Sequence, residues 1–325
     1  MRRYIAKRLL WLIPIMMLIS FITFALMYLS PGDPVIILLT QDGSAPDDAT
    51  VAAMREKLGL NDSFWVQYGR WLKNLLHGDL GTSIFTKHPV MQDIGTYFPN
   101  TLRLALLSMF FTLLISIPLG ILTAVHENKL IDYVIRILTF TTGALPGFFA
   151  ALMLIYLFGV KLRWLPTVSS GSPKGIIMPT MTLALTLSAS YIRQIRAEII
   201  NELGENYIRM LRARGIKERM ILYGGALKSV MPSILTLAGM RFGALLGGTS
   251  IIEIVCTYQG LGRLAVNSIT NRDYPLMQGF VLMMAAIYVL VNLVVDIAHA
   301  YADPRVMNRI LAENGGRKRH AKKTA

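Results

Sequence analysis

The sequence predicts an all-α protein that crosses a membrane six times. Of its 325 residues, 54% are hydrophobic and only 16% are charged. The apolar residues gather in runs of about twenty, the length of helix that spans a hydrocarbon core roughly 30 Å thick. A soluble chain of this size can bury a core without such runs. The expected spans lie near residues 10–29, 102–125, 138–160, 176–192, 233–255 and 277–299.

The first apolar run follows a basic lead-in, MRRYIAKR. A secretory signal begins in the same way, but its apolar region is shorter and a small-residue cleavage site follows it. This run is too long, and no such site follows it. We therefore expect residues 1–30 to remain in the protein as an N-terminal anchor helix.

Lysine and arginine are spread unevenly over the segments that join the spans. Residues 193–231 carry eight of them and the tail after residue 300 carries seven, whereas residues 31–100 carry five against eight acidic residues. Because positively charged loops stay in the cytoplasm, both termini are expected inside and residues 31–100 outside. This topology explains the net charge of +14 without nucleic acid as a partner. It predicts a multi-pass protein of the cell (inner) membrane, in contact with lipid.

The outer segment, residues 31–100, contains one amphipathic stretch. Its apolar side chains recur at helical spacing before Gly78 ends the run, and they are Trp65, Tyr68, Trp71, Leu72 and Leu75. We expect a helix that lies on the outer surface. Such a helix either seals its own loop against the membrane or contacts an outside partner.

Residues 193–231 form the longest expected cytoplasmic loop, and they contain the charged stretch RMLRARGIKERM. On a helical wheel one side is apolar, with Ile200, Leu203, Tyr207, Ile208, Met210 and Leu211. The opposite side carries Glu202, Glu205, Arg209 and Arg212. Gly215 stands where a left-handed cap ends a helix, and a second short helical stretch follows it as far as Pro232. Periodicity alone is equally typical of a helix that lies on the membrane surface.

The order and spacing of several short motifs resemble the peptide/nickel permeases, a branch of the binding-protein-dependent ABC importers. Tyr207 is followed by Ala213-Arg214-Gly215, and Pro232 comes seventeen residues after that glycine. Other shared strings, in chain order, are YIAKRLLWLIP, SPGDP, QYGRWL, GDLGTS, PNTLRLAL, ALP, GLGRL, NRDYPLMQG and DPR. Together they extend over nearly the whole chain.

The resemblance implies a type I ABC importer permease fold, with a permease core at residues 101–300 and a basic tail at 301–325. It also implies that the loop holds a coupling helix that docks on a cytoplasmic ATPase subunit, through Glu205, Tyr207, Arg209, Leu211, Arg212, Ala213, Arg214 and Gly215. The implied partners are ABC ATPase subunits, a second homologous permease and an extracytoplasmic solute-binding protein. The chain departs from the family pattern at Leu211 and at Tyr258-Gln259, where Trp-Pro is usual.

The sequence predicts no catalytic residue, no metal site and no cofactor bound by this chain. It has no G-x-x-x-x-G-K-[ST] motif, so ATP is expected to be used by the partner subunits. Its five histidines are scattered, and its single cysteine, Cys256, excludes an internal disulfide. Asp296 and His299 lie three apart on one helix face, as a structural pair or as part of the pathway.

Two features of the fifth span bear on the pathway. Gly239, Gly243 and Gly247 recur every fourth residue and form a stripe for close helix packing, within the chain or against another subunit. Arg241 lies inside the expected span, where a charge is costly unless it faces water, an ion-pair partner or the bundle interior. We therefore take Arg241, together with Glu253, as candidates for the pathway or the bundle interior.

A second function class is a self-contained secondary transporter driven by an ion gradient. Such transporters tend to show repeated halves and acidic residues near the membrane midplane, and neither feature is evident in this sequence. The favoured function is therefore the ABC importer permease. Its substrate stays open between short peptides and nickel or other metal chelates.

Overall fold

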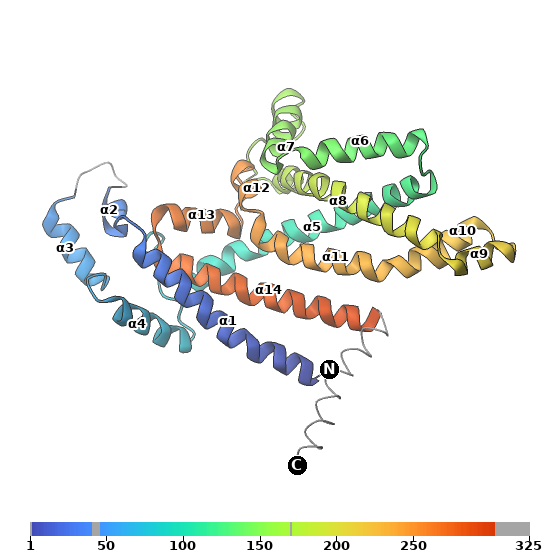
Figure 1. The fold of residues 1–325 in the computed structure, drawn as a ribbon. Coiled ribbons are helices and arrows are strands. Elements are labelled where there is room, and N and C mark those ends of the chain that lie inside the picture. Colours follow the sequence, from blue (N-terminus) through green and yellow to red (C-terminus); the bar gives the residue numbers. More distant parts are fainter. Residues whose placement is uncertain (1, 41–45, 170, 303–325) are drawn as a thin grey trace, which may run out of the picture. The chain divides into compact units, whose positions relative to one another are not determined.

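The computed structural model describes residues 2–40, 46–169 and 171–302, and these residues form helices and connecting loops with no strand (Figure 1). Five helices of this part are long and apolar enough to cross a membrane, or six if one sharply bent pair is counted as a single span. This confirms the all-α class and agrees with six spans. The long helices are α1 (Arg2–Leu29), α5 (Val90–Val125), α8 (Ile177–Leu203), α11 (Leu227–Gly248) and α14 (Tyr274–Ala302).

The chain divides into two compact units, each described here by itself. The N-terminal unit comprises residues 5–101 and 259–290. The core unit contains the described residues of 102–258, together with residues 2–4 and 291–302.

The third expected span, at 138–160, is wrong in shape. Helix α6 (Leu130–Ala144) starts earlier than expected and stops before Pro146, and α7 (Gly147–Leu154) then leaves at an angle of 104°. A proline disfavours helical conformation in the residue before it, and Leu145 has an extended ψ of 130°. The chain continues from α7 into a π-helix, η1 (Ile155–Lys161).

The fifth span also differs from the expected 233–255. It begins at α10 (Glu218–Met220), passes through the π-helix η3 (Ile221–Ala226) and continues as α11. Pro232, expected at the mouth of the span, lies inside α11. Beyond α11 the chain forms a separate short helix, α12 (Ser250–Val255), and then α13 (Leu261–Asn271), which was not predicted.

In the N-terminal unit, the described residues that follow α1 form three short helices: α2 (Pro34–Leu39), α3 (Asp48–Lys57) and α4 (Phe64–Leu76). Helix α4 is the predicted amphipathic helix. Its Phe64 and Tyr68 rings pack on Phe24 of α1, at centroid distances of 5.3 and 5.4 Å. Gly78 follows with a left-handed φ of 81°. The contact supports the expectation that α4 seals its own loop, while other side chains of α4 stay exposed.

In the core unit, a buried ion pair holds α6 against α8. The guanidinium of Arg196 donates to both carboxylate oxygens of Asp132, at 2.8 Å each, and Asp132 is fully buried. The backbone N–H of Asn128 donates a third hydrogen bond to Asp132, at 3.0 Å. Because removal of one partner leaves a buried charge uncompensated, breaking such a pair costs about 3–5 kcal/mol. Helix α8 is thereby fixed just before it enters the charged segment.

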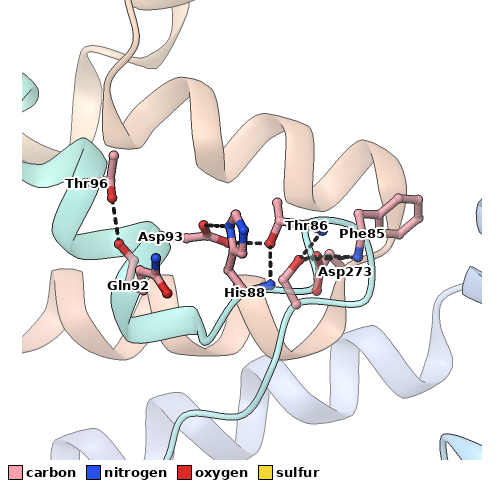
Figure 2. Close-up of polar contacts among 8 residues, drawn as sticks. Phe85, Thr86, His88, Gln92, Asp93, Thr96 and Asp273 are labelled. Atoms are coloured by element: carbon pink, nitrogen blue, oxygen red, sulfur yellow. Dashed lines mark hydrogen bonds and ion pairs between the residues drawn. The ribbon is translucent and has the colours of Figure 1, made fainter.

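A second buried carboxylate, Asp273, organises the loop that precedes α5 (Figure 2). It accepts hydrogen bonds from the Ser83 hydroxyl and from the backbone N–H groups of Ile84 and Phe85, the latter two at 3.3 and 3.5 Å. It also accepts from the N–H of Leu276 at 3.3 Å, which caps the start of α14. One side chain therefore ties the loop to a membrane-spanning helix.

The other end of the same loop is held by Asp93 of α5 (Figure 2). The Thr86 hydroxyl donates to this carboxylate at 2.6 Å, and the His88 ring lies 3.3 Å from it. An isolated bridge between Thr82 and Pro89 closes the base of the loop. The loop is thus fixed by polar contacts on both sides although its tip is exposed.

Replacement of Asp273 by alanine is expected to release this loop, because hydrogen bonds to a charged group contribute about 1.5–3 kcal/mol each. Trypsin should then cut after the exposed Lys87 several-fold faster than in the wild type. Asp48→Ala, an exposed carboxylate of α3, is the matched control and should leave the cleavage rate unchanged. Equal cleavage rates in the two variants would show that Asp273 does not order the loop.

Candidate functional site

The charged segment predicted to dock on a partner folds as a separate element at the junction of α8 and α11 (Figure 1). Helix α8 ends at Leu203, and the extended Glu205 (ψ 150°) begins a new helix, α9 (Asn206–Ala213). The expected continuous helix is therefore broken at Gly204. The break makes α9 a distinct short helix.

The end of α9 follows the Schellman pattern. The N–H of Gly215 donates to the carbonyl of Arg212 at 2.9 Å, and the N–H of Ile216 donates to that of Leu211 at 3.2 Å. Gly215 has a left-handed φ of 73°, as the sequence predicted for a cap. A Cβ at this position would meet no atom within 4 Å. Glycine is therefore favoured here because of the left-handed backbone conformation, and not because a side chain would clash with a neighbour.

One residue of α9 is fully buried, and most of the others face outward. Ile208 is fully buried and lies against Gly225 of η3. Leu211 is half-buried, whereas Met210, expected on the apolar side, is 60% exposed. The other exposed side chains of α9 and its two flanking residues are those of Glu205, Asn206, Tyr207, Arg209, Arg212, Ala213 and Arg214.

Two polar contacts fix the orientation of α9. The guanidinium of Arg212 pairs with the Glu218 carboxylate of α10 at 2.7 Å. The hydroxyl of Tyr207 donates to Glu202 of α8 at 2.6 Å. Burial, and then this hydrogen bond, raise the pKa of Tyr207 to about 12, so its hydroxyl stays protonated and keeps donating at alkaline pH as well as at neutral pH. Helix α9 is thus connected to both neighbouring helices.

A hollow on the same element is lined by Arg219, Met220, Tyr223 and Gly224. Met220 and Tyr223 are 65% and 53% exposed, so the hollow has apolar side chains beside a cationic one. It lies on the π-helix η3 and the turn before it, and π-helical turns are frequent at functional sites. Together, α9, α10 and η3 offer an exposed surface of mixed apolar and basic character.

Arg241, a candidate for the pathway or the bundle interior, is exposed in this chain. It shares an exposed face of α11 with Met240, Ala244, Gly247 and Gly248. These positions repeat at helical spacing, so the face runs along the last turns of α11. Arg241 therefore lies on the surface of the core unit and not in its interior.

The three glycines predicted as one stripe do not share one environment. Gly239 packs against α14, where a Cβ would come within 2.4 Å of the Val295 side chain. Gly243 is buried, but Gly247 is exposed. Four residues of an α-helix turn by about 40° more than a full circle. Glycines at every fourth position therefore shift around the helix axis, and Gly247 falls on the exposed face although Gly243 is buried.

Glu253 belongs to α12 and is fully buried in the core unit. Its carboxylate accepts a hydrogen bond from the Thr249 hydroxyl at 2.8 Å. This places it in the interior of the folded chain, whereas Arg241 is on the surface. Among the described residues no three His, Cys, Asp or Glu side chains gather as metal ligands, and the side chains of Asp296 and His299 lie outside that part.

The structure gives physical roles to motifs that the sequence only matched. The Thr101 hydroxyl in PNTLRLAL accepts from the N–H of Leu261 in GLGRL, at 2.7 Å. The Asn100 amide donates to the carbonyl of Gln259 at 2.7 Å, a backbone contact that does not depend on the unusual residue there. In NRDYP, the guanidinium of Arg272 donates to the Ser30 carbonyl in SPGDP at 3.3 Å.

Sequence reasoning assigned no role to Asp132, Arg196 or Asp273. Asp273 had a usable pattern, because an Asp followed at the second position by Pro is typical of a helix start. Asp132 and Arg196 are 64 residues apart, and nothing in their local sequence indicates that they pair. The motif DPR, at residues 303–305, lies outside the described residues.

The family comparisons agree with this architecture. A family model described as "Binding-protein-dependent transport system inner membrane component" matches residues 116–308. A companion model for the N-terminal part of such membrane components matches residues 1–105.

Similar proteins include the glutathione transport system permease protein GsiC of Salmonella paratyphi A, which is 36% identical over 306 residues, covering 94% of this chain and 99% of that protein. The dipeptide transport system permease protein DppB of Alkalihalophilus pseudofirmus is 34% identical over 334 residues, with the same coverage.

Two crystal forms of the MetNI methionine ABC transporter in inward-facing conformations share the fold. Their TM-scores are 0.52 and 0.55 at 16% identity, and the match covers 66% of this chain and 97% of that chain. The family models, the relatives and the helical architecture thus agree, and the chain belongs to the binding-protein-dependent transport system inner membrane components, as a multi-pass permease of the peptide ABC importer family.

Proposed function

We propose that this permease forms, with a second homologous permease, the pathway of an ATP-driven importer of short peptides. An extracytoplasmic binding protein delivers the peptide, and separate cytoplasmic subunits hydrolyse ATP. Support for peptides comes from relatives named for glutathione and dipeptide transport. Those names give no support to nickel, the other substrate expected from the resemblance.

The observation that carries the proposal is the α9 element. A short helix fixed by the buried Ile208, capped by Gly215 and presenting several arginines outward is suited to contact a soluble protein. Interface charges steer encounter and fix register more than they add affinity. Arg209 and Arg214 supply such charges, while Tyr207 and Met210 supply apolar contact area. We assign this surface to the ATPase subunit.

The exposed face of α11 suits the second permease. Small residues at Ala244, Gly247 and Gly248 permit close approach of another helix. Arg241 on the same face is costly in lipid, because an arginine in a membrane-spanning helix needs water or a partner. A neighbouring permease would supply a partner for Arg241, and a pathway between the two subunits would supply water. No feature of the described residues favours the ion-coupled transporter instead.

From the positive-inside distribution we expect the α9 element and both termini to lie in the cytoplasm. A cysteine at position 48 should then react with an impermeant thiol reagent added outside the cell, whereas one at position 322 should react only after the membrane is opened. The native Cys256 is 1% exposed and serves as the internal negative control. Labelling of position 322 but not of position 48 in intact cells would reverse the topology.

Gly215→Val is expected to uncouple the permease without removing it from the membrane. A residue with a Cβ pays about 1–2 kcal/mol in the left-handed conformation, which is a factor of about 5–30 in a folding equilibrium. Co-purification of the ATPase subunit and peptide uptake should both fall, at unchanged membrane abundance.

Gly215→Asn is the matched control, because asparagine tolerates the left-handed conformation and occurs at such caps. It should retain most of the assembly and uptake. Normal assembly and uptake in the valine variant would defeat the assignment of α9 to the ATPase subunit.

A further inference from the structure

The N-terminal unit contains a cavity that the proposed transport function does not use. Its volume is about 240 Å³, whereas one water molecule takes about 30 Å³ in the liquid. The cavity can therefore hold a chain of several heavy atoms. Its walls come from the end of α1, from α4, from the loop before α5 and from the start of α14.

Most of the cavity wall is apolar or aromatic. Helix α1 contributes Phe24, Met27 and Tyr28, and later segments add Leu80 and Ile84. Of these, Phe24, Met27, Leu80 and Ile84 are among the buried hydrophobic side chains of the unit. A ligand that fills this space must present a hydrocarbon surface.

A smaller part of the wall is polar, and some of its polar groups can still form hydrogen bonds with a ligand. The Gln278 side chain lines the cavity and is only 3% exposed, so its amide can donate a hydrogen bond to a ligand in that space. The indole N–H of Trp71, in the neighbouring wall, is buried and lacks an acceptor among the described residues. Buried polar groups normally have partners. These two donors therefore suit an oxygen acceptor on the ligand.

Among the described residues, one charged side chain lines the cavity, and it is already paired. Arg70 forms a salt bridge with Asp62, which neutralises it. A short peptide carries a charge at each end, and this cavity offers no free charge for either end. The chemistry fits a neutral ester or amide oxygen attached to a hydrocarbon chain.

The surroundings of the cavity indicate where such a ligand comes from. Two of its walls are the ends of membrane-spanning helices, α1 and α14. Tyr28 of the cavity wall is 46% exposed, and Trp65 and Leu76, on the α4 helix that lines the cavity with other residues, are 70% and 80% exposed. Exposed Tyr and Trp at the ends of spans are typical of the membrane interface. A ligand with ester oxygens and hydrocarbon chains at that depth is a phospholipid.

We propose that this cavity binds one acyl chain of a glycerophospholipid, with an ester carbonyl accepting a hydrogen bond from the Gln278 amide. The bound chain fills the space between α1, α4 and α14 and seals the amphipathic helix to the spans. The site is independent of α9, so loss of ATPase coupling leaves it intact.

The test uses the full-length chain co-expressed with its partner subunits and purified in detergent. Native mass spectrometry counts retained phospholipid, and a phosphatidylethanolamine with a photoreactive group on one acyl chain maps the contact after bulk lipid is washed away. The wild type should retain one phospholipid and label residues of the cavity wall, such as Met27 and Trp71.

Two variants and two matched controls complete the test. Asn74→Trp places an indole in the cavity wall and should lower retention at least fivefold, whereas Asn61→Trp, outside the cavity, should not. Gln278→Leu keeps the side-chain size without the amide and should lower retention about threefold or more, whereas Gln92→Leu on α5 should not.

Three results would overturn the lipid site. The wild type could retain detergent or no lipid at all. The variants Asn74→Trp and Asn61→Trp could retain lipid equally. The photoreactive lipid could fail to label the cavity wall while a peptide of a partner protein is found there instead.

Discussion

A hydrocarbon core offers no water to the backbone, so every N–H and C=O within it must be satisfied by the chain itself. The long helices of this permease follow from that constraint, and so does the placement of its interruptions. In the described part of the chain, five helices meet the length and hydropathy of a span, and the sixth candidate is bent by 104° at Pro146. Two π-helical stretches, η1 and η3, keep the backbone hydrogen-bonded where the α-helical register changes. At η1 and η3 the change of helical register therefore leaves the backbone N–H and C=O groups hydrogen-bonded within a helix.

Polar side chains then decide how the helices are tied together within each unit. In the core unit, Asp132 and Arg196 join α6 to α8 through two hydrogen bonds of 2.8 Å. In the N-terminal unit, Asp273 caps α14 and binds the loop before α5. Both carboxylates are buried, so their partners cannot be removed without leaving a charge uncompensated. Asp273 lies in NRDYPLMQG, a motif that the sequence analysis used only for the family resemblance. The structure shows which contacts this residue of the motif makes.

The length of the apolar runs was sufficient to predict the all-α membrane class, and the helical spacing of apolar side chains predicted the amphipathic helix α4. The six expected spans agree with the described residues only if the bent pair of α6 and α7 counts as one span. These patterns failed where one residue changes the direction of the chain. The break at Pro146 was missed because hydropathy does not register a proline within an apolar run, although the residue before it is restricted. Pro232 was taken as a boundary, yet α11 passes through it. Pairs far apart in the sequence, such as Asp132 with Arg196, require the fold itself.

The proposed coupling surface depends on a helix cap, which the sequence predicted, and on a tertiary packing contact, which it did not predict. The cap at Gly215 was predicted from position alone, whereas the burial of Ile208 against η3 depends on the packing of two separate segments. The outward face of α9 follows from both. That face is the part of the molecule on which the proposed transmission of ATP hydrolysis to the pathway depends.

The most direct measurement places a photo-crosslinking amino acid at successive positions of α9 in intact membranes that contain the whole importer. Arg209, Met210 and Ala213 are exposed, and crosslinks to the ATPase subunit are expected from them. The buried Ile208 should give crosslinks only within the permease. Crosslinks from the exposed positions to lipid alone, with none to an ATPase subunit, would contradict the assignment of α9 as the coupling helix.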